Sequence, residues 1–209
     1  MEPLRLAVAA YTDLPPELIA TVVTYLEMRA SVAQGARPEA GLAFVRLRGG
    51  QAGRYLALYR ALGERWMWFS RLALAPQALA AILDDPGVEA YAAVRDGADV
   101  GLVELDARAE DETELAFLGL VEGAVGAGLG RALMAQAVGR AFARPIRRLF
   151  VHTCTFDHPR AVGFYRACGF EPYKFAIELT RDPRLEGLLP PQAAPHVPLL
   201  HTRKVRDGT

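Results

Sequence analysis

The stretch Glu114-Leu-Ala-Phe-Leu-Gly-Leu120, followed by Val125-Gly-Ala-Gly-Leu-Gly-Arg131, decides how the rest of this chain is interpreted. The apolar run predicts a buried strand, and Gly126, Gly128 and Gly130 predict a tight loop that opens a helix. The first N–H groups of a helix have no partner inside it, and the helix dipole favours an anion at that end. The stretch therefore predicts a phosphate-binding turn, with a plain tight connection between packed elements as the alternative.

Length and charge limit the classes of function to consider. The chain has 209 residues, enough for one domain with a full core. Its 24 basic and 24 acidic side chains cancel, so it lacks the basic character of a nucleic-acid-binding protein. The sequence shows neither a basic-then-apolar start nor an apolar run of roughly 18 residues, so we expect neither export nor membrane spanning. We expect a cytoplasmic protein that binds neither nucleic acid nor membrane, with Cys154 and Cys168 as free thiols.

Periodicity and turn residues predict alternating strands and helices. A possible first strand at 4–10 is followed by a helix that Thr12 or Asp13 caps. The apolar face of this helix consists of Leu18, Val22 and Leu26. Further strands are predicted at 42–47, 88–94, 100–105, 114–121, 149–155 and 175–179, with a hairpin at Asp96-Gly97, and further helices at 76–83, 128–143 and 159–168. This order predicts an α/β (α+β) fold in which a mixed sheet carries helices on its faces.

The segment beyond Arg181 differs from the rest in composition. It contains five prolines, at positions 183, 190, 191, 195 and 198. Proline favours an extended backbone, so we predict an extended tail that lies over the domain or is loose in solvent.

Two segments at a characteristic separation carry a family pattern. The first is Arg/Gln-x-x-Gly-x-Gly/Ala between a strand and a helix, matched by Val125-Gly-Ala-Gly-Leu-Gly130. The second is Asn-x-x-Ala-x-x-x-Tyr-x-x-x-Gly-Phe, matched by His158-Pro-Arg-Ala-Val-Gly-Phe-Tyr165-Arg-Ala-Cys-Gly-Phe170. Through these segments the chain from about Trp66 to Leu179 resembles the GNAT superfamily of acyl-CoA-dependent N-acetyltransferases.

The chain departs from the family pattern at two positions. Val125 stands where the family has Arg or Gln, and His158 stands where it has Asn. Backbone N–H groups do most of the phosphate binding, and Arg131 is available to supply the missing charge. Glu122 would repel a phosphate unless its side chain points away from the loop.

The resemblance implies a mixed, mostly antiparallel central sheet flanked by helices on both faces, in a single GNAT domain. The implied core is 66–180, with an acceptor-side N-terminal segment at 1–65 and a Pro-rich tail at 181–209. The implied co-substrate is acetyl-CoA, held by residues of the loop 125–131 together with His158, with no metal.

The resemblance also implies catalytic roles. A glutamate at the position of Glu114 is the general base in some members of the family, and Glu104 and His152 are the other candidates. Backbone N–H groups between Leu118 and Leu120 are implied to stabilise the oxyanion. The implied general acid toward the leaving thiolate is Tyr165.

Each of these assignments has a structural alternative. Tyr165 lies among apolar helix residues, so a packed core tyrosine is the alternative to its catalytic role, and the alternative for Glu114 is a solvated charge at a strand end. A zinc site made of His152, Cys154, Asp157 and His158 is disfavoured, because their spacing matches no usual zinc finger. A Rossmann dinucleotide site is disfavoured because its third glycine is missing.

We therefore predict an enzyme that transfers acetyl from acetyl-CoA to a primary amine by direct attack in a ternary complex. A non-catalytic acyl-CoA-binding sensor is the alternative from another class. The sequence does not identify the amine, because selectivity is expected to lie in residues 12–65, the part with the fewest signals. A homodimer is a further expectation, prompted by the aromatic segment around Trp66 and the Pro-rich tail.

Overall fold

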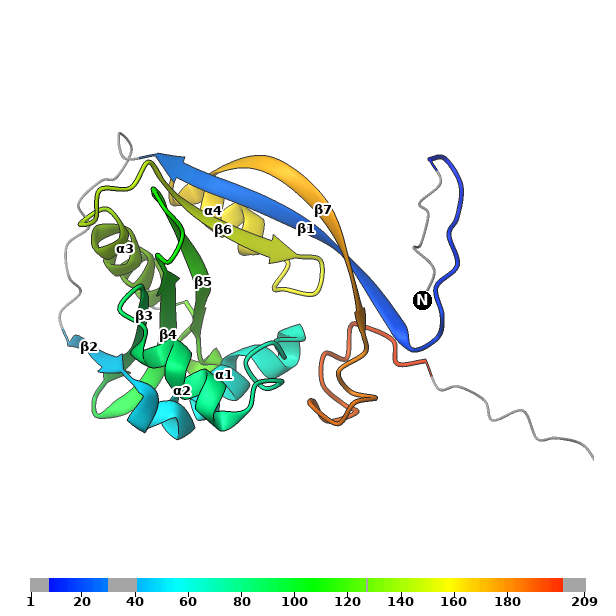
Figure 1. Ribbon diagram of the computed structural model, residues 1–209, viewed down its shortest axis with the longest axis horizontal. Coiled ribbons are helices and arrows are strands. Elements are labelled where there is room, and N and C mark those ends of the chain that lie inside the picture. The colour runs from blue at the N-terminus through cyan, green and yellow to red at the C-terminus, as the bar shows by residue number, and fades with distance from the viewer. Residues whose placement is uncertain (1–7, 30–40, 127, 201–209) are drawn as a thin grey trace, which may run out of the picture.

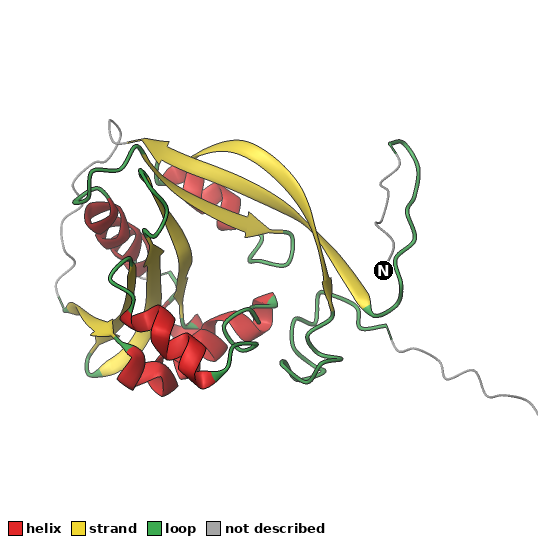
Figure 2. Cartoon of the chain, viewed as in Figure 1, coloured by secondary structure: helices red, strands yellow, loops and turns green. Residues whose placement is uncertain are grey.

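The protein forms one mixed sheet with helices on both of its faces (Figures 1 and 2). The structure is a computed structural model and describes residues 8–29, 41–126 and 128–200. Its strands run in the order β2-β3-β4-β5-β6-β1-β7. Their bounds are β1 Leu18–Arg29, β2 Leu42–Leu47, β3 Val88–Arg95, β4 Ala98–Asp106, β5 Glu112–Leu120, β6 Arg148–Cys154 and β7 Glu171–Arg181. Every neighbouring pair is antiparallel except β5 and β6, so the predicted fold class is confirmed.

Four α-helices in the described residues cover the sheet: α1 Ala52–Gly63, α2 Pro76–Asp84, α3 Leu129–Ala141 and α4 Ala161–Ala167. Helices α1 and α2 pack on one face over a buried cluster that includes Tyr55, Tyr59 and Leu102. Helices α3 and α4 pack on the other face, where Leu133 and Leu149 belong to a second cluster. Among the described residues, none of the helices has the length and apolar character needed to cross a membrane.

The N-terminal part of the chain is where the expected secondary structure is wrong. The segment predicted as the first helix is the strand β1, which lies between β6 and β7. Five of the seven residues 18–24 are β-branched, which favours a strand over a helix. The i, i+4 spacing of Leu18, Val22 and Leu26 is equally compatible with alternation, because all three are even-numbered. Of the strand predicted at 4–10, residues 4–7 lie outside the described residues and 8–10 form a turn.

Helix α1 was not predicted, although the sequence carries its signal. Tyr55, Leu58, Tyr59 and Leu62 follow the i, i+3, i+4, i+7 spacing of an apolar helix face, and all four are buried. The helix is followed by the 3-10 turn η3 (Glu64–Trp66) and a loop that leads to α2. Trp66 ends η3 and Trp68 lies in this loop, and both contact residues that follow β6.

The expectation of an extended tail is wrong for residues 182–200, which form a compact series of turns that we call the tail lobe. Its anchor is a buried ion pair in which Arg184 lies 2.6 Å from Asp182, and Arg184 also donates to the carbonyls of Ala193 and Val197. Leu189 and Ala193–Ala194 pack against Met67 in the loop after η3. One arginine that bonds several carbonyls folds the Pro-rich segment back, and the tail lobe thereby covers the loop after α1.

Candidate functional site

The sheet opens where β5 and β6 separate. Their parallel pairing covers only Glu112–Glu114 and Arg148–Phe150, after which β5 stays with β4 and β6 stays with β1 (Figure 1). The N–H of Val121 bonds to the carbonyl of Val100 in β4. Because alternate residues of an antiparallel ladder bond to the same neighbour, Leu118 and Leu120 turn their backbone groups toward β6, where the ladder has ended. These are the two positions predicted to present free N–H groups.

The glycine loop that follows β5 has the predicted form of strand, turn and helix. After the 3-10 turn η4 (Glu122–Ala124), the backbone adopts a φ of +96° at Gly126 and +78° at Gly128, which is the N-cap of α3. A side chain at either position would be strained, so glycine is required there. Gly130 is different, because it is helical and a Cβ built on it would meet Phe164 at an ordinary 3.5 Å. Two of the three predicted glycines therefore shape the loop.

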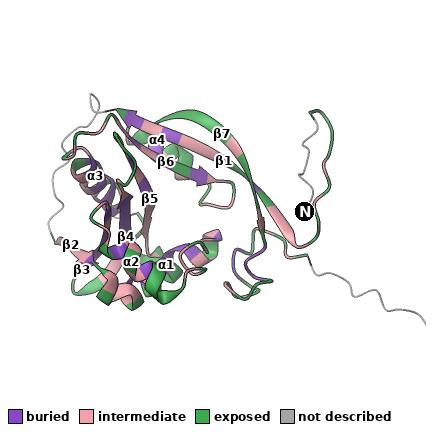
Figure 3. Ribbon diagram, in the orientation of Figure 1, coloured by how far each residue is buried: buried purple, intermediate pink, exposed green. Residues whose placement is uncertain are grey.

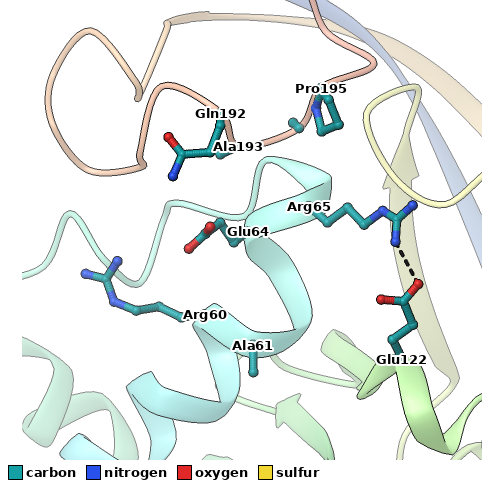
Figure 4. Close-up of a pocket in the computed structure, with 9 residues that line it drawn as sticks. Arg60, Ala61, Glu64, Arg65, Glu122, Gln192, Ala193 and Pro195 are labelled. Carbon is teal, nitrogen blue, oxygen red and sulfur yellow. Dashed lines mark hydrogen bonds and ion pairs between the residues drawn. The ribbon is translucent and has the colours of Figure 1, made fainter.

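Exposed side chains determine the charge around this loop. Val125 and Arg131 are both exposed, and Arg131 stands in the first turn of α3. Glu122 does not disturb the loop, since its carboxylate points to Arg65 at 2.8 Å (Figure 4). Arg131 is the cation nearest in sequence to the positive, N-terminal end of α3, and the helix end and this side chain both favour a bound anion.

Beside the Arg65–Glu122 pair is a hollow of about 570 Å³ between the end of α1 and the tail lobe, lined by Arg60, Glu64, Gln192 and Pro195.

Two of the three candidate bases form a pair. Nδ1 of His152 lies 2.8 Å from a carboxylate oxygen of Glu114, just beyond the last β5–β6 pair at Phe150. The hydrogen bond to Glu114 raises the pKa of His152 above its usual 6.5, although burial opposes the shift. Because Glu114 accepts the proton on Nδ1, the neutral ring keeps its lone pair on Nε2. The ring of Tyr25 in β1 lies 5.5 Å from the imidazole, centroid to centroid, so β1 forms part of this site.

The third candidate base is engaged elsewhere. Glu104 is completely buried beneath α1, and its carboxylate accepts hydrogen bonds from the Tyr55 hydroxyl and from Arg71 at 2.6 Å. Both carboxylate oxygens of Glu104 are thus occupied by hydrogen bonds from other side chains. Glu104 is well placed to hold the loop before α2 against the sheet and poorly placed to accept a proton from a substrate.

Tyr165 is a buried residue of α4. Its ring packs edge-on against Phe164 and Phe170, and it belongs to the cluster under α3. Burial raises the pKa of its hydroxyl well above 10, and the nearby charge of Asp157 adds to the shift. The hydroxyl therefore stays protonated at neutral pH and can donate a hydrogen bond. Packing in the core and a role as a donor are compatible in this position.

A hydrogen bond that the sequence did not predict joins the two sides of the opening. Trp68, in the loop after η3, donates from Nε1 to Asp157 at 3.0 Å. The other carboxylate oxygen of Asp157 accepts from the Thr153 hydroxyl and from the N–H of Cys154 at the end of β6. The Trp68 ring also packs on Phe117 of β5, 5.2 Å between centroids. Trp68 therefore spans from β5 to β6 beyond the end of their ladder.

His158 lies at the junction of three segments. Its ring is 5.0 Å from that of Trp66, which in turn is 5.5 Å from the ring of His196 in the tail lobe. Nδ1 of His158 accepts a hydrogen bond from the N–H of Arg160, which leaves Nε2 to carry the proton. Within the described residues no group of three or more His, Cys, Asp or Glu side chains is arranged to hold a metal ion.

Comparison with known proteins explains this arrangement of strands and loop. The sequence model of the Acetyltransferase (GNAT) family matches residues 55–170, which is more than half of the 209 residues. The chain belongs to the GNAT family. The family generally uses acetyl-CoA as its acetyl donor. No curated protein matches the chain in sequence.

Solved structures show the same GNAT fold at low identity. A conserved protein of unknown function from Staphylococcus epidermidis has a TM-score of 0.60 at 16% identity, covering 79% of this chain and 63% of its own length. A GCN5-related N-acetyltransferase from Kribbella flavida has a TM-score of 0.56 at 20% identity, with coverages of 82% and 63%. An aminoglycoside acetyltransferase from an uncultured soil sample, solved with sisomicin, has a TM-score of 0.51 at 17% identity, with coverages of 62% and 88%. The match thus spans less than two thirds of the length of each of the first two structures.

Proposed function

We propose that this protein transfers the acetyl group of acetyl-CoA to a primary amine by direct attack within a ternary complex. The observation that carries the proposal is the end of the β5–β6 ladder after Glu114, which frees the backbone groups of Leu118 and Leu120 beside the glycine loop. A thioester laid along β5 would find N–H donors for its carbonyl and an anion-binding turn for its pyrophosphate.

The proposed coenzyme site uses the backbone of the loop and one side chain. The positive φ values at Gly126 and Gly128 turn the loop so that the first N–H groups of α3 are available, and Arg131 adds a cation. No side chain at Val125 is needed for this contact, which accounts for the departure from the family pattern.

The proton chemistry is assigned to His152 with Glu114 as its positioning residue. A primary amine has a pKa near 10.4, so deprotonation at pH 7 costs roughly 4.6 kcal/mol in water. Nε2 of His152 takes a proton from the amine as the new C–N bond forms, while Glu114 stabilises the imidazolium through Nδ1. Raising the pKa of His152 strengthens it as a base near neutral pH.

Stabilisation of the leaving thiolate is assigned to Tyr165. As the tetrahedral intermediate collapses, the C–S bond breaks and the thiolate of coenzyme A leaves. The Tyr165 hydroxyl, kept protonated by burial, donates a hydrogen bond to that sulfur. Reference pKa values of about 8.5 for a thiol and 10 for tyrosine make full transfer uphill, so the hydrogen bond is the larger part of this role.

Two measurements on the purified protein test the proposal. Calorimetry with acetyl-CoA tests binding, and release of free coenzyme A thiol over a panel of amines tests transfer. The panel includes an aminoglycoside, because one structural relative is an aminoglycoside acetyltransferase. If the protein transfers acetyl to an amine, the release of coenzyme A thiol should require both the amine and an intact His152. Binding without amine-dependent release would make the protein an acyl-CoA sensor, and no binding at millimolar acetyl-CoA would overturn both assignments.

A further inference from the structure

The outer edge of β7 is a long strand edge that no other strand or loop among residues 8–29, 41–126 and 128–200 pairs with. Figure 3 shows β7 largely in the colour of exposed residues, and Phe175 and Ile177 are 71% and 51% exposed. Among the described residues, no backbone hydrogen bond outside the sheet's own ladders involves residues 172–180. The opposite edge strand, β2, has 6 residues against the 11 of β7. An exposed apolar strand edge of this length is a template for pairing with another strand.

The hydrogen bonds of β1 show which groups of β7 face outward. Both the N–H and the carbonyl of Val22 bond to Thr155, on the side of β1 that faces away from β7. Val22 is the register partner of Ile177, so the backbone groups of Ile177 are also turned away from β1. By alternation Phe175 and Leu179 face outward in the same way. A strand that docks on this edge must therefore bond to the odd-numbered residues.

We propose that the outer edge of β7 pairs antiparallel with β7 of a second copy of this chain, with Ala176 on the two-fold axis. In this register Phe175 lies opposite Ile177 of the second copy, and both have outward-facing backbone groups as the ladder requires. Lys174 then lies opposite Glu178 of the second copy, and the two-fold repeats each pair.

Charge selects this register among those that the backbone allows. With Phe175 on the axis, Lys174 would face Ala176, and with Ile177 on the axis it would face Thr180. Only Ala176 on the axis places each lysine opposite a glutamate, on the face of the sheet that also carries Tyr25. The Lys174 ammonium lies 3.7 Å from the Tyr25 ring centroid and has three donors, so it can keep this contact and bond to a glutamate. The register shift between Tyr25 and Leu26 turns the backbone of Pro172 outward as well, and because proline lacks an N–H it limits the ladder at its other end.

Charge reversal tests the register. Light scattering and sedimentation of the full chain at high micromolar concentration should show a dimer. Lys174→Glu and Glu178→Lys each place like charges opposite one another twice, and each should weaken association about tenfold or more. The double variant restores opposite charges and should return association to within a few-fold of the original. A monomeric wild-type protein, or a dimer indifferent to the single reversals, would overturn the proposal.

A cysteine on the axis gives a second test that does not depend on charge. Opposed residues of a pair without hydrogen bonds lie about 4.5 Å apart between Cα atoms, which suits a disulfide. Ala176→Cys should therefore cross-link two copies under mild oxidation. Thr180→Cys is the matched control, because its two copies would lie about 27 Å apart along the strands. Cross-linking of Ala176→Cys no faster than that of Thr180→Cys would contradict the two-fold at Ala176, whatever the enzymatic activity of either variant.

Discussion

His152 is the residue whose protonation state controls the proposed reaction, because only its neutral ring can accept a proton from the amine. Its pKa lies above 6.5 through the hydrogen bond to Glu114, so the rate should rise with pH through that higher value. Glu114→Gln removes the charge and retains an acceptor for Nδ1. We expect kcat to fall and the acid limb of kcat/KM against pH to move to lower pH.

The matched control for this prediction is Glu112→Gln on the same strand. Glu112 pairs with Arg148 at 2.7 Å, and the main causes of the raised pKa of His152 are other groups, with Glu114 first. Its removal should leave the acid limb in place. An equal displacement of the acid limb in both variants would contradict the prediction. It would show that any negative charge on β5, and not the Glu114–His152 pair in particular, sets the pH dependence of kcat/KM.

The hydroxyl of Tyr165 can be removed without changing the packing of its ring. Tyr165→Phe retains the ring contacts with Phe164 and Phe170 and removes only the hydroxyl. We expect kcat to fall by about 10²-fold with little change in KM for acetyl-CoA, because the hydroxyl acts on the departing sulfur. Steady-state kinetics and a thermal melt on the same sample measure both effects. Unchanged kcat with an unchanged melt would make Tyr165 a core residue only.

At the scale of the element, the glycine loop and the first turn of α3 respond differently to an added methyl group. Gly128→Ala places a Cβ at a φ of +78°, which strains the loop by about 1–2 kcal/mol and should weaken acetyl-CoA binding. Gly130 is helical, and the Cβ of Gly130→Ala would make only ordinary contacts. The free energy of unfolding should therefore stay level or rise by up to about 1 kcal/mol, with acetyl-CoA binding unchanged. Denaturant melts and calorimetry distinguish the two, and equal losses of binding would contradict the assigned loop geometry.

At the scale of the whole molecule, the tail lobe depends on one buried ion pair. Arg184→Met leaves the Asp182 carboxylate without its partner in a site where both side chains are 2% exposed. We expect a loss of about 3–5 kcal/mol, seen as release of the lobe. Limited proteolysis within 183–200 and a change in tryptophan fluorescence should report it, because Trp66 contacts His196 of the lobe.

The control for the lobe is an exposed ion pair elsewhere. Arg147→Met breaks the contact with Asp111, where the side chains are 79% and 51% exposed, and should cost less than about 1 kcal/mol. Equal protease sensitivity in both variants would contradict an anchoring role for Arg184.

Features that arise from contacts between neighbouring residues could be predicted from the sequence. The glycine loop before α3, the hairpin at Asp96-Gly97 and the helices α2 to α4 follow from turn chemistry and i, i+4 spacing, which act over a few residues. The spacing of Tyr55, Leu58, Tyr59 and Leu62 also predicts α1 once it is noticed. For the same local reason, Gly126 and Gly128 were identified from their neighbours alone.

Features that depend on strands distant in sequence could not be predicted in this way and are seen only in the folded sheet. The placement of β1 between β6 and β7 needs pairings across more than a hundred residues, and the strand end that frees Leu118 and Leu120 depends on where two neighbours part. The contact between Glu114 and His152 has the same origin, as does the folding of the tail by Arg184. Local spacing fixes which way a backbone turns, whereas strand register and sheet order depend on the packing of the complete sheet.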